Sequence, residues 1–171
     1  MYEAIKKRGS QLWRTVAWYL LISAILHLGW EFAHMPLYTI WQFGSVSEIL
    51  FSGVHCTIGD VMIAGASLAT GVFAFGDNRW PQERWRAVAV VTVCGGLGYT
   101  IFSEWYNTTI SQAWTYSELM PLLPGTGIGV SPLAQWVFIP VIALATAYWR
   151  SQQAVADTKT DPISDVKGFG R

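Results

Sequence analysis

The sequence of 171 residues is poor in charged residues, cysteine and histidine. Acidic and basic residues number 11 each, so the formal net charge at pH 7 is zero. A nucleic-acid-binding protein needs a basic surface, and no basic patch interleaved with aromatic residues occurs here, so we exclude nucleic acid as a partner. The two cysteines, Cys56 and Cys94, lie in apolar runs. Free cysteine is commonly buried in such runs, so neither residue indicates a redox compartment.

Apolar residues dominate the composition. They make up 52% of the chain, whereas charged residues make up 13%, and there are ten tryptophans. This balance is richer in apolar residues than that of a typical soluble domain and indicates an integral membrane protein in contact with the lipid bilayer. The length suits one domain. We expect a single transmembrane domain over residues 1–150 and a disordered cytoplasmic tail over residues 151–171.

Four long apolar runs predict an all-α fold, a bundle of four transmembrane helices. The first run is too long for a secretory signal peptide and has no small-residue cleavage site. Pro36 cannot continue a helix and ends this span. Ser45 and Glu48 have the spacing of a capping box at the start of the next helix. The predicted spans are residues 12–35, 49–75, 87–106 and 132–149.

Lysine and arginine are absent from the two connections that follow the first and third predicted spans. Basic residues cluster instead before the first span, between the second and third, and after the fourth. The positive-inside rule therefore predicts that both termini are cytoplasmic. The periplasmic connection before the fourth span is expected to contain a short amphipathic helix in the interface, with Trp114 and Met120 facing lipid and Glu118 facing water.

The stretch HLGWEFAHMPLY brings ionisable residues into the last third of the first span. Such residues are costly inside a membrane and usually have a function. His27, Glu31 and His34 fall within an arc of about 60° on one helix face, so three potential ligands or proton carriers point the same way. The predicted topology places six ionisable residues in one half of the bilayer: His27, Glu31, His34, His55, Asp60 and Glu104.

Polar residues of the third and fourth spans extend this group. Thr100, Glu104, Asn107 and Thr108 form a polar stripe on the third span, and Gln135 is placed to face inward from the fourth. Together with the first two spans, they predict a polar cavity inside the bundle that is open to the periplasm.

Three histidines and three carboxylates suit one or two transition-metal ions, for which zinc, iron and copper are the candidates. Glu31-x-x-His34 repeats the spacing of di-iron and di-manganese bundle sites, although those sites use the motif twice and Glu104-x-x-Asn107 lacks the second histidine. A metal would also let buried carboxylates stay ionised. The predicted metal ligands are His27, Glu31, His34, His55 and Glu104. The catalytic candidates are Glu104, as a proton carrier, and Asp60, as a further ligand or a group that orients an imidazole.

This site predicts redox or hydrolytic chemistry on a small lipid-soluble or periplasmic substrate. The alternative is a small proton-coupled transporter, channel or accessory subunit in which the same groups form a proton or solute pathway. The groups could also pair only to fix the helix register. A haem held by His27 and His55 is a further alternative, which the three nearby carboxylates disfavour.

A path across the membrane needs polar groups in both halves of the bundle. In the inner half, the sequence offers little beyond Ser23, Ser67, Thr70 and Thr92. A site that is open to one side is therefore preferred over a through-route.

Four phrases of the sequence resemble a type of small bacterial inner-membrane protein: HLGWEFAHMPLY, YTIFSEWYN, WTYSELMP and GIGVSPLAQW. This resemblance implies a location and no activity. More remotely, four spans with embedded histidine, glutamate, aspartate and tryptophan are similar to the sterol-isomerase and sigma-2 receptor group. No motif of that group can be matched residue by residue, so it implies no role for any residue here.

Overall fold

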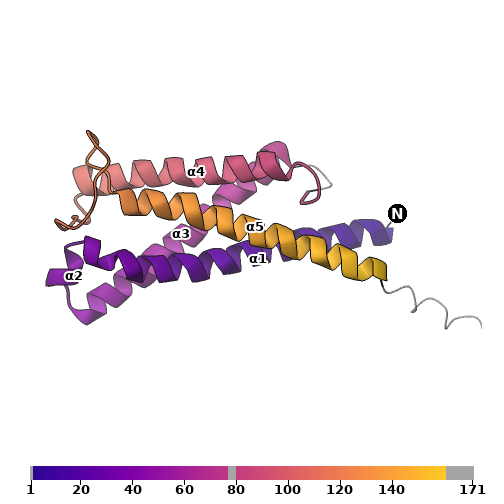
Figure 1. Ribbon diagram of the computed structural model, residues 1–171, viewed down its shortest axis with the longest axis horizontal. Coiled ribbons are helices and arrows are strands. Elements are labelled where there is room, and N and C mark those ends of the chain that lie inside the picture. The colour runs from indigo at the N-terminus through magenta and orange to yellow at the C-terminus, as the bar shows by residue number, and fades with distance from the viewer. Residues whose placement is uncertain (1, 77–79, 161–171) are drawn as a thin grey trace, which may run out of the picture.

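The computed structural model describes residues 2–76 and 80–160, and it is helical throughout apart from turns and one extended connection (Figure 1). The long helices are α1 (Tyr2–His34), α3 (Val46–Phe75), α4 (Trp85–Trp105) and α5 (Val130–Thr160). Three short elements lie between them: a 3-10 turn, η1 (Met35–Leu37), the single-turn helix α2 (Ile40–Phe43), and a π-helical turn, η2 (Tyr106–Ile110).

Four segments are long and apolar enough to cross a membrane: Gln11–Leu37, Val46–Phe75, Trp85–Ile110 and Val130–Gln153. The predicted all-α class and the four apolar spans are therefore confirmed. The fourth helix differs from the prediction at its far end. α5 continues to Thr160, through residues that were expected to be disordered, because the run after Arg150 is rich in residues that tolerate a helix, such as alanine and glutamine. Residues 161–171 of the predicted tail lie outside the described residues.

The helix boundaries follow local signals in the sequence. Ser45 is the N-cap of α3, where its hydroxyl accepts a hydrogen bond from the backbone N–H of Glu48 and its own N–H donates to the Glu48 carboxylate, 2.8 Å away. The predicted capping box is thus confirmed. α1 ends at His34, and Pro36 lies in the turn η1 that follows it. Proline cannot extend the hydrogen-bond ladder of a helix.

The four long helices form a closed ring of neighbours. α1 packs against α3 and α5, and α4 packs against the same two helices, so α1 and α4 lie diagonally across the bundle. Both ends of the described chain, Tyr2 and Thr160, lie at the same end of the bundle, which we call the terminal end (Figure 1). At the opposite end, α1 stops at His34 and α3 begins at Val46. We call this the site end.

Apolar side chains cover the outside of the bundle as well as its core. Large hydrophobic residues are exposed on all four long helices, for example Ile25 on α1, Phe73 on α3, Val90 on α4 and Phe138 on α5. Contiguous apolar surface of this extent is rare on soluble proteins. These helices are consistent with contact with a lipid bilayer, and the chain is a multi-pass membrane protein.

One connection folds back over the site end of the bundle. Residues 111–129, which we call the cover segment, contain no helix, so the predicted interfacial helix is wrong. Instead, the N–H of Thr39 donates to the carbonyl of Thr115 at 3.0 Å, and the N–H of Ser117 donates to that of Leu37 at 2.9 Å. Two prolines and two glycines with positive φ, Gly125 and Gly127, favour this turn-rich path over a helix.

Trp136 fixes the distance between α4 and α5. Its side chain is 1% exposed, and a Cβ added to Gly96 would lie 2.1 Å from its ring. The ring therefore occupies space that only glycine leaves free at this position.

Gly96→Ala is expected to lower the free energy of unfolding by about 1–3 kcal/mol, because the added methyl group overpacks the contact with Trp136. Gly98→Ala on the same helix is the matched control. Nothing lies within 4 Å of the added Cβ, so the substitution should be neutral or slightly stabilising. The measurement is reversible unfolding by SDS titration in mixed micelles. Equal stability of the two variants would contradict the packing role of Gly96.

Candidate functional site

α1 places three ionisable side chains inside the site end of the bundle. His27 is 0% exposed, Glu31 is 6% exposed and His34 is 7% exposed. Their spacing puts them on one helix face, and this face looks toward α3 and α5, the two helices against which α1 packs. The first span therefore presents its polar residues to the bundle interior and not to lipid.

Gln135 of α5 joins these side chains to α3. Its Nε2 atom lies 2.9 Å from Nδ1 of His27, 2.9 Å from Oε1 of Glu31 and 3.0 Å from Oδ2 of Asp60. His27 Nδ1 lies 3.2 Å from the same Asp60 oxygen. An amide group has two hydrogens to donate. It can therefore serve both carboxyl groups at once, and the Nδ1 proton of His27 then serves Asp60. We call these four residues the His27 cluster.

His34 extends the His27 cluster toward the site end. Its Nε2 atom lies 3.2 Å from Oε2 of Glu31, and its Nδ1 atom lies 3.1 Å from the hydroxyl oxygen of Ser131 on α5. The ring also meets Tyr38 edge-on, with the ring centroids 5.2 Å apart. Glu31 thus contacts Gln135 through Oε1 and His34 through Oε2. Because Gln135 also contacts His27, Glu31 connects the two histidines.

Glu104 of α4 is held by the cover segment. The Tyr116 hydroxyl donates to Oε2 of Glu104 and accepts a hydrogen bond from the N–H of Gly129 at 3.0 Å. Burial, and then the neighbouring carboxylate of Glu104, raise the pKa of Tyr116 above its ordinary value. The phenol therefore keeps its proton and acts as the donor to Glu104. Glu104 itself is 6% exposed.

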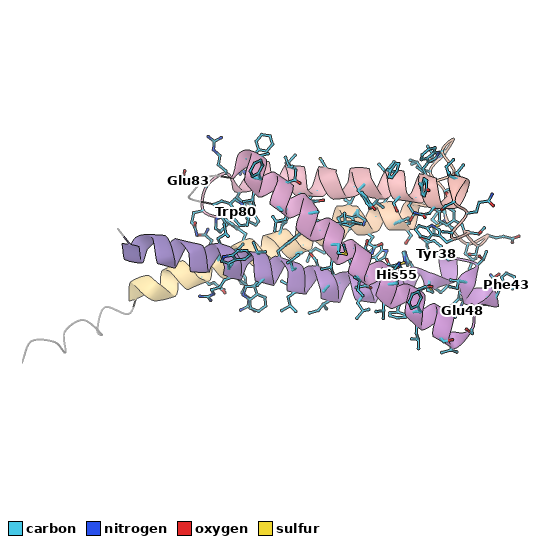
Figure 2. All side chains as sticks on the ribbon, turned by 180° about the vertical axis from the view of Figure 1, so that it is seen from behind. Tyr38, Phe43, Glu48, His55, Trp80 and Glu83 are labelled. Carbon is cyan, nitrogen blue, oxygen red and sulfur yellow. The ribbon has the colours of Figure 1, made fainter. Side chains whose placement is uncertain are left out.

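His55 lies outside this group of contacts. It is exposed on α3, where its ring stacks on Phe51 with centroids 5.4 Å apart (Figure 2). Five residues of helix separate it from Asp60, which corresponds to a turn of about 140° around the axis. Because Asp60 faces the bundle interior, His55 is carried to the outer surface. The structure therefore does not bring His55 to the other predicted ligands, and a haem between His27 and His55 does not fit.

The predicted metal ligands are brought together only in part. His27, Glu31 and His34 belong to one hydrogen-bonded group, while Glu104 is near enough to His34 to interact electrostatically. Within residues 2–76 and 80–160, no group of three or more histidine, cysteine, aspartate or glutamate side chains is arranged to hold a metal ion. The zinc, iron or copper site has no support from this geometry, and it stays a prediction.

The site is covered, although the sequence predicts a cavity open to the outside. The cover segment reaches across the end of α1, where Ser117 donates its hydroxyl to the carbonyl of Pro36 at 3.1 Å and Tyr116 packs against Tyr38 with ring centroids 5.4 Å apart. Asp60, with a side chain that is 13% exposed, is the most accessible member of the His27 cluster.

Sequence reasoning missed the residues that surround the ionisable groups. Gln135 was expected to face inward, but nothing in its spacing indicates that its amide nitrogen lies within 3.0 Å of three partners. Ser131 lies directly before the predicted fourth span and was given no role in the site. Tyr116 was not singled out, because the helix predicted around it faces lipid and water. The contacts of both arise from chain segments about 100 and 12 residues away from their partners, which local patterns do not encode.

Comparisons with protein families, with curated proteins and with solved structures find no match to this chain. The fold and the site define a class by themselves: a multi-pass helical membrane protein with a buried network of histidine, carboxyl and amide groups. The functional argument below is built on that network.

Gln135→Leu should lower the free energy of unfolding by about 1–3 kcal/mol, because leucine fills similar space but leaves buried carboxyl oxygens without their donor. Gln42→Leu on α2 is the control, since that side chain is exposed, and its effect should stay within about 0.5 kcal/mol. SDS titration followed by circular dichroism measures both. A Gln135→Leu variant as stable as the control would show that the amide does not hold the network together.

Proposed function

We propose that the protein is a small proton-coupled membrane protein, a transporter or accessory subunit, in which the His27 cluster takes up and releases protons. The observation that supports this function is the pairing of two histidines with two carboxyl groups through one shared amide. His27 is paired with Asp60, His34 is paired with Glu31, and Gln135 contacts both carboxyl groups.

Protons are the positive charges that can balance the carboxylates inside this bundle. The sequence contains no lysine or arginine from residue 15 to residue 78, or from residue 87 to residue 149. Burying a carboxylate without a compensating positive charge is costly. The negative charges of Asp60 and Glu31 must therefore be balanced by protons, held either on the carboxyl groups or on the neighbouring imidazole rings.

The proton count of the site follows from the pairs. A neutral imidazole beside a protonated carboxyl group has no net charge, and neither has an imidazolium beside a carboxylate. Each histidine–carboxyl pair is therefore neutral when it holds one proton more than a neutral imidazole and a carboxylate do. Loss of one proton leaves a single carboxylate, which an N–H group of Gln135 can stabilise through a charge-assisted hydrogen bond. The Gln135 amide contacts the carboxyl groups of both pairs. A negative charge on either carboxyl group is therefore stabilised by the same amide. This links the titration of the two pairs.

A chain of contacts leads from the His27 cluster toward the surface. Glu31 contacts Nε2 of His34, whose Nδ1 contacts the hydroxyl of Ser131, a residue that is only partly buried. An imidazole with partners on both nitrogens can accept a proton on one side and release it on the other. In the topology that the basic residues predict, this surface faces the periplasm.

Two features favour proton exchange over the predicted metal chemistry. Both ring nitrogens of His34 already have protein partners, Glu31 and Ser131. His55, the third histidine that a metal site would need, is exposed on the outer surface of α3.

The histidine rings should titrate as members of a pair. With the three histidines labelled with nitrogen-15 in nanodiscs, the ring signals of His27 should respond to pH. In Asp60→Asn the ring loses the carboxyl oxygen that lies 3.2 Å from its Nδ1 atom, so the ring signals of His27 should differ from those of the wild type. His55→Ala is the matched control, and it should leave the titration of His27 and His34 unchanged.

Two results would contradict the proposal. One is a His27 signal that does not respond to pH between about 4 and 9, a range that covers the usual titration of histidine and carboxyl groups. The other comes from elemental analysis of the purified protein. A stoichiometric metal ion that is lost in the His27→Ala/His34→Ala double variant and kept in His55→Ala would support the metal prediction instead.

A further inference from the structure

α1 carries polar residues at a spacing that an apolar span does not need. From residue 11 to residue 31, every fourth position has a hydrogen-bonding side chain. These positions form one row of the i±4 type along the helix surface. We call the row the α1 polar ridge, and its members are Gln11, Thr15, Tyr19, Ser23, His27 and Glu31.

The α1 polar ridge lies inside the bundle. Thr15 is 2% exposed, while Tyr19, Ser23 and His27 are each 0% exposed. Twenty residues of helix rise about 30 Å, which matches the thickness of the hydrocarbon core of a membrane. The ridge therefore extends from the His27 cluster to the terminal end of the bundle. It supplies polar groups to the half of the bundle near the terminal end, where Thr15 and Tyr19 add to the hydroxyls named from the sequence.

The middle of the ridge has polar atoms without partners in the protein. His27 Nε2, the Ser23 hydroxyl and the Tyr19 hydroxyl are all buried, and none makes a hydrogen bond of ordinary geometry with another described residue, although the Tyr19 and Ser23 hydroxyls lie close enough to interact with each other. They occupy three successive levels of the helix. Orphaned polar groups are rare in proteins and rarer in membranes, where no bulk solvent can satisfy them.

Two buried hydroxyls on other helices are satisfied in the ordinary way, whereas that of Thr100 on α4 also makes no hydrogen bond with a described residue. Thr57 on α3 donates to the carbonyl of Gly53 at 2.7 Å, and Thr92 on α4 donates to the carbonyl of Val88 at 2.8 Å. Each uses the backbone one helical turn before it, as threonine and serine commonly do in helices. Ser23 has the same carbonyl type available but makes no such bond. Its hydroxyl is therefore available to the neighbouring Tyr19 hydroxyl or to water.

Water fits the rise between successive levels of the ridge. Levels four residues apart are separated by about 6 Å along the helix. Two hydrogen bonds of about 2.8 Å through a single water molecule span about the same distance. Buried water typically makes bonds to polar groups that the protein leaves unsatisfied.

We propose that the α1 polar ridge carries a file of water molecules from the terminal end of the bundle to Nε2 of His27, so that the proton site is reached from both sides of the membrane. This inference rests on the proposed function and extends it, because a one-sided proton site becomes a proton path.

His27 is the transfer point of this path. A proton from the water file forms a bond to Nε2, and the Nδ1 proton passes to the Asp60 carboxylate, so one N–H bond forms while another breaks. The ring returns to its first tautomer when it turns. The charged and titratable groups around His27 are Glu31 on its own helix and Asp60 on α3, while α5 contributes the uncharged Gln135 and Trp136. On α4, Glu104 interacts electrostatically with Glu31.

At the terminal end, the ridge meets α5. Thr15 donates its hydroxyl to the carbonyl of Gln11 at 3.0 Å, and the Gln11 side chain donates to the carbonyl of Ser151 at 3.3 Å. Gln11 is partly exposed. It is therefore placed where the water file would open to the aqueous phase.

Proton flux into liposomes tests the inference. The wild-type protein is reconstituted with an entrapped pH-sensitive dye, and flux is driven by a potassium gradient with valinomycin. Removal of the two hydroxyls in Tyr19→Phe/Ser23→Ala should lower the flux at least tenfold. Thr92→Val is the matched control, because it removes a fully buried hydroxyl outside the ridge, and it should conduct like the wild type.

Different results separate the inference from the proposed function. If the wild type carries no flux, or if the double variant conducts as well as the wild type, the water file is wrong, even where His27 and Asp60 still titrate together. If His27 does not titrate, the proposed function itself fails. Should the double variant not fold, exchange between water and Nε2 of His27 in the nitrogen-15-labelled wild type decides the matter. Rapid exchange supports the file, and its absence overturns it.

Discussion

The cost of charge inside a membrane governs this structure. The bundle contains carboxyl groups but has no lysine or arginine along most of its length, so each buried carboxyl group needs a proton or a neutral donor. Gln135 meets that need for two carboxyl groups with a single amide. Its position depends on α5 lying close to α4, which in turn depends on Trp136 filling the space beside Gly96. The ordinary packing of two helices thus positions the polar network.

Much of the fold could be predicted because its signals are local. Apolar runs, a proline after α1 and the capping box at Ser45 mark the four helices directly. The common face of His27, Glu31 and His34 follows from helix geometry. The cover segment could not be predicted in the same way, because its conformation depends on hydrogen bonds with residues about 80 positions away in the sequence.

The candidate site was predictable in its members on α1 but not in its pairing. The angle between His55 and Asp60 shows only that both cannot point straight at α1, and the packing of α3 decides that Asp60 faces inward and His55 outward. The row of polar residues on α1 is visible in the sequence. A list of the hydroxyl groups in one half of the membrane does not reveal the row, because the row is defined by a spacing of four residues along α1 and includes Tyr19.

The central claim is that the carboxyl groups of the His27 cluster share protons with the imidazole rings. Infrared difference spectroscopy of the protein in lipid, recorded between acidic and neutral pH, observes the carbonyl stretch of a protonated carboxyl group directly. The account predicts a pH-dependent carboxylic-acid band from a buried environment, which is altered or lost in Asp60→Asn. The absence of any such band in the wild type, or an unchanged band in Asp60→Asn, would contradict it.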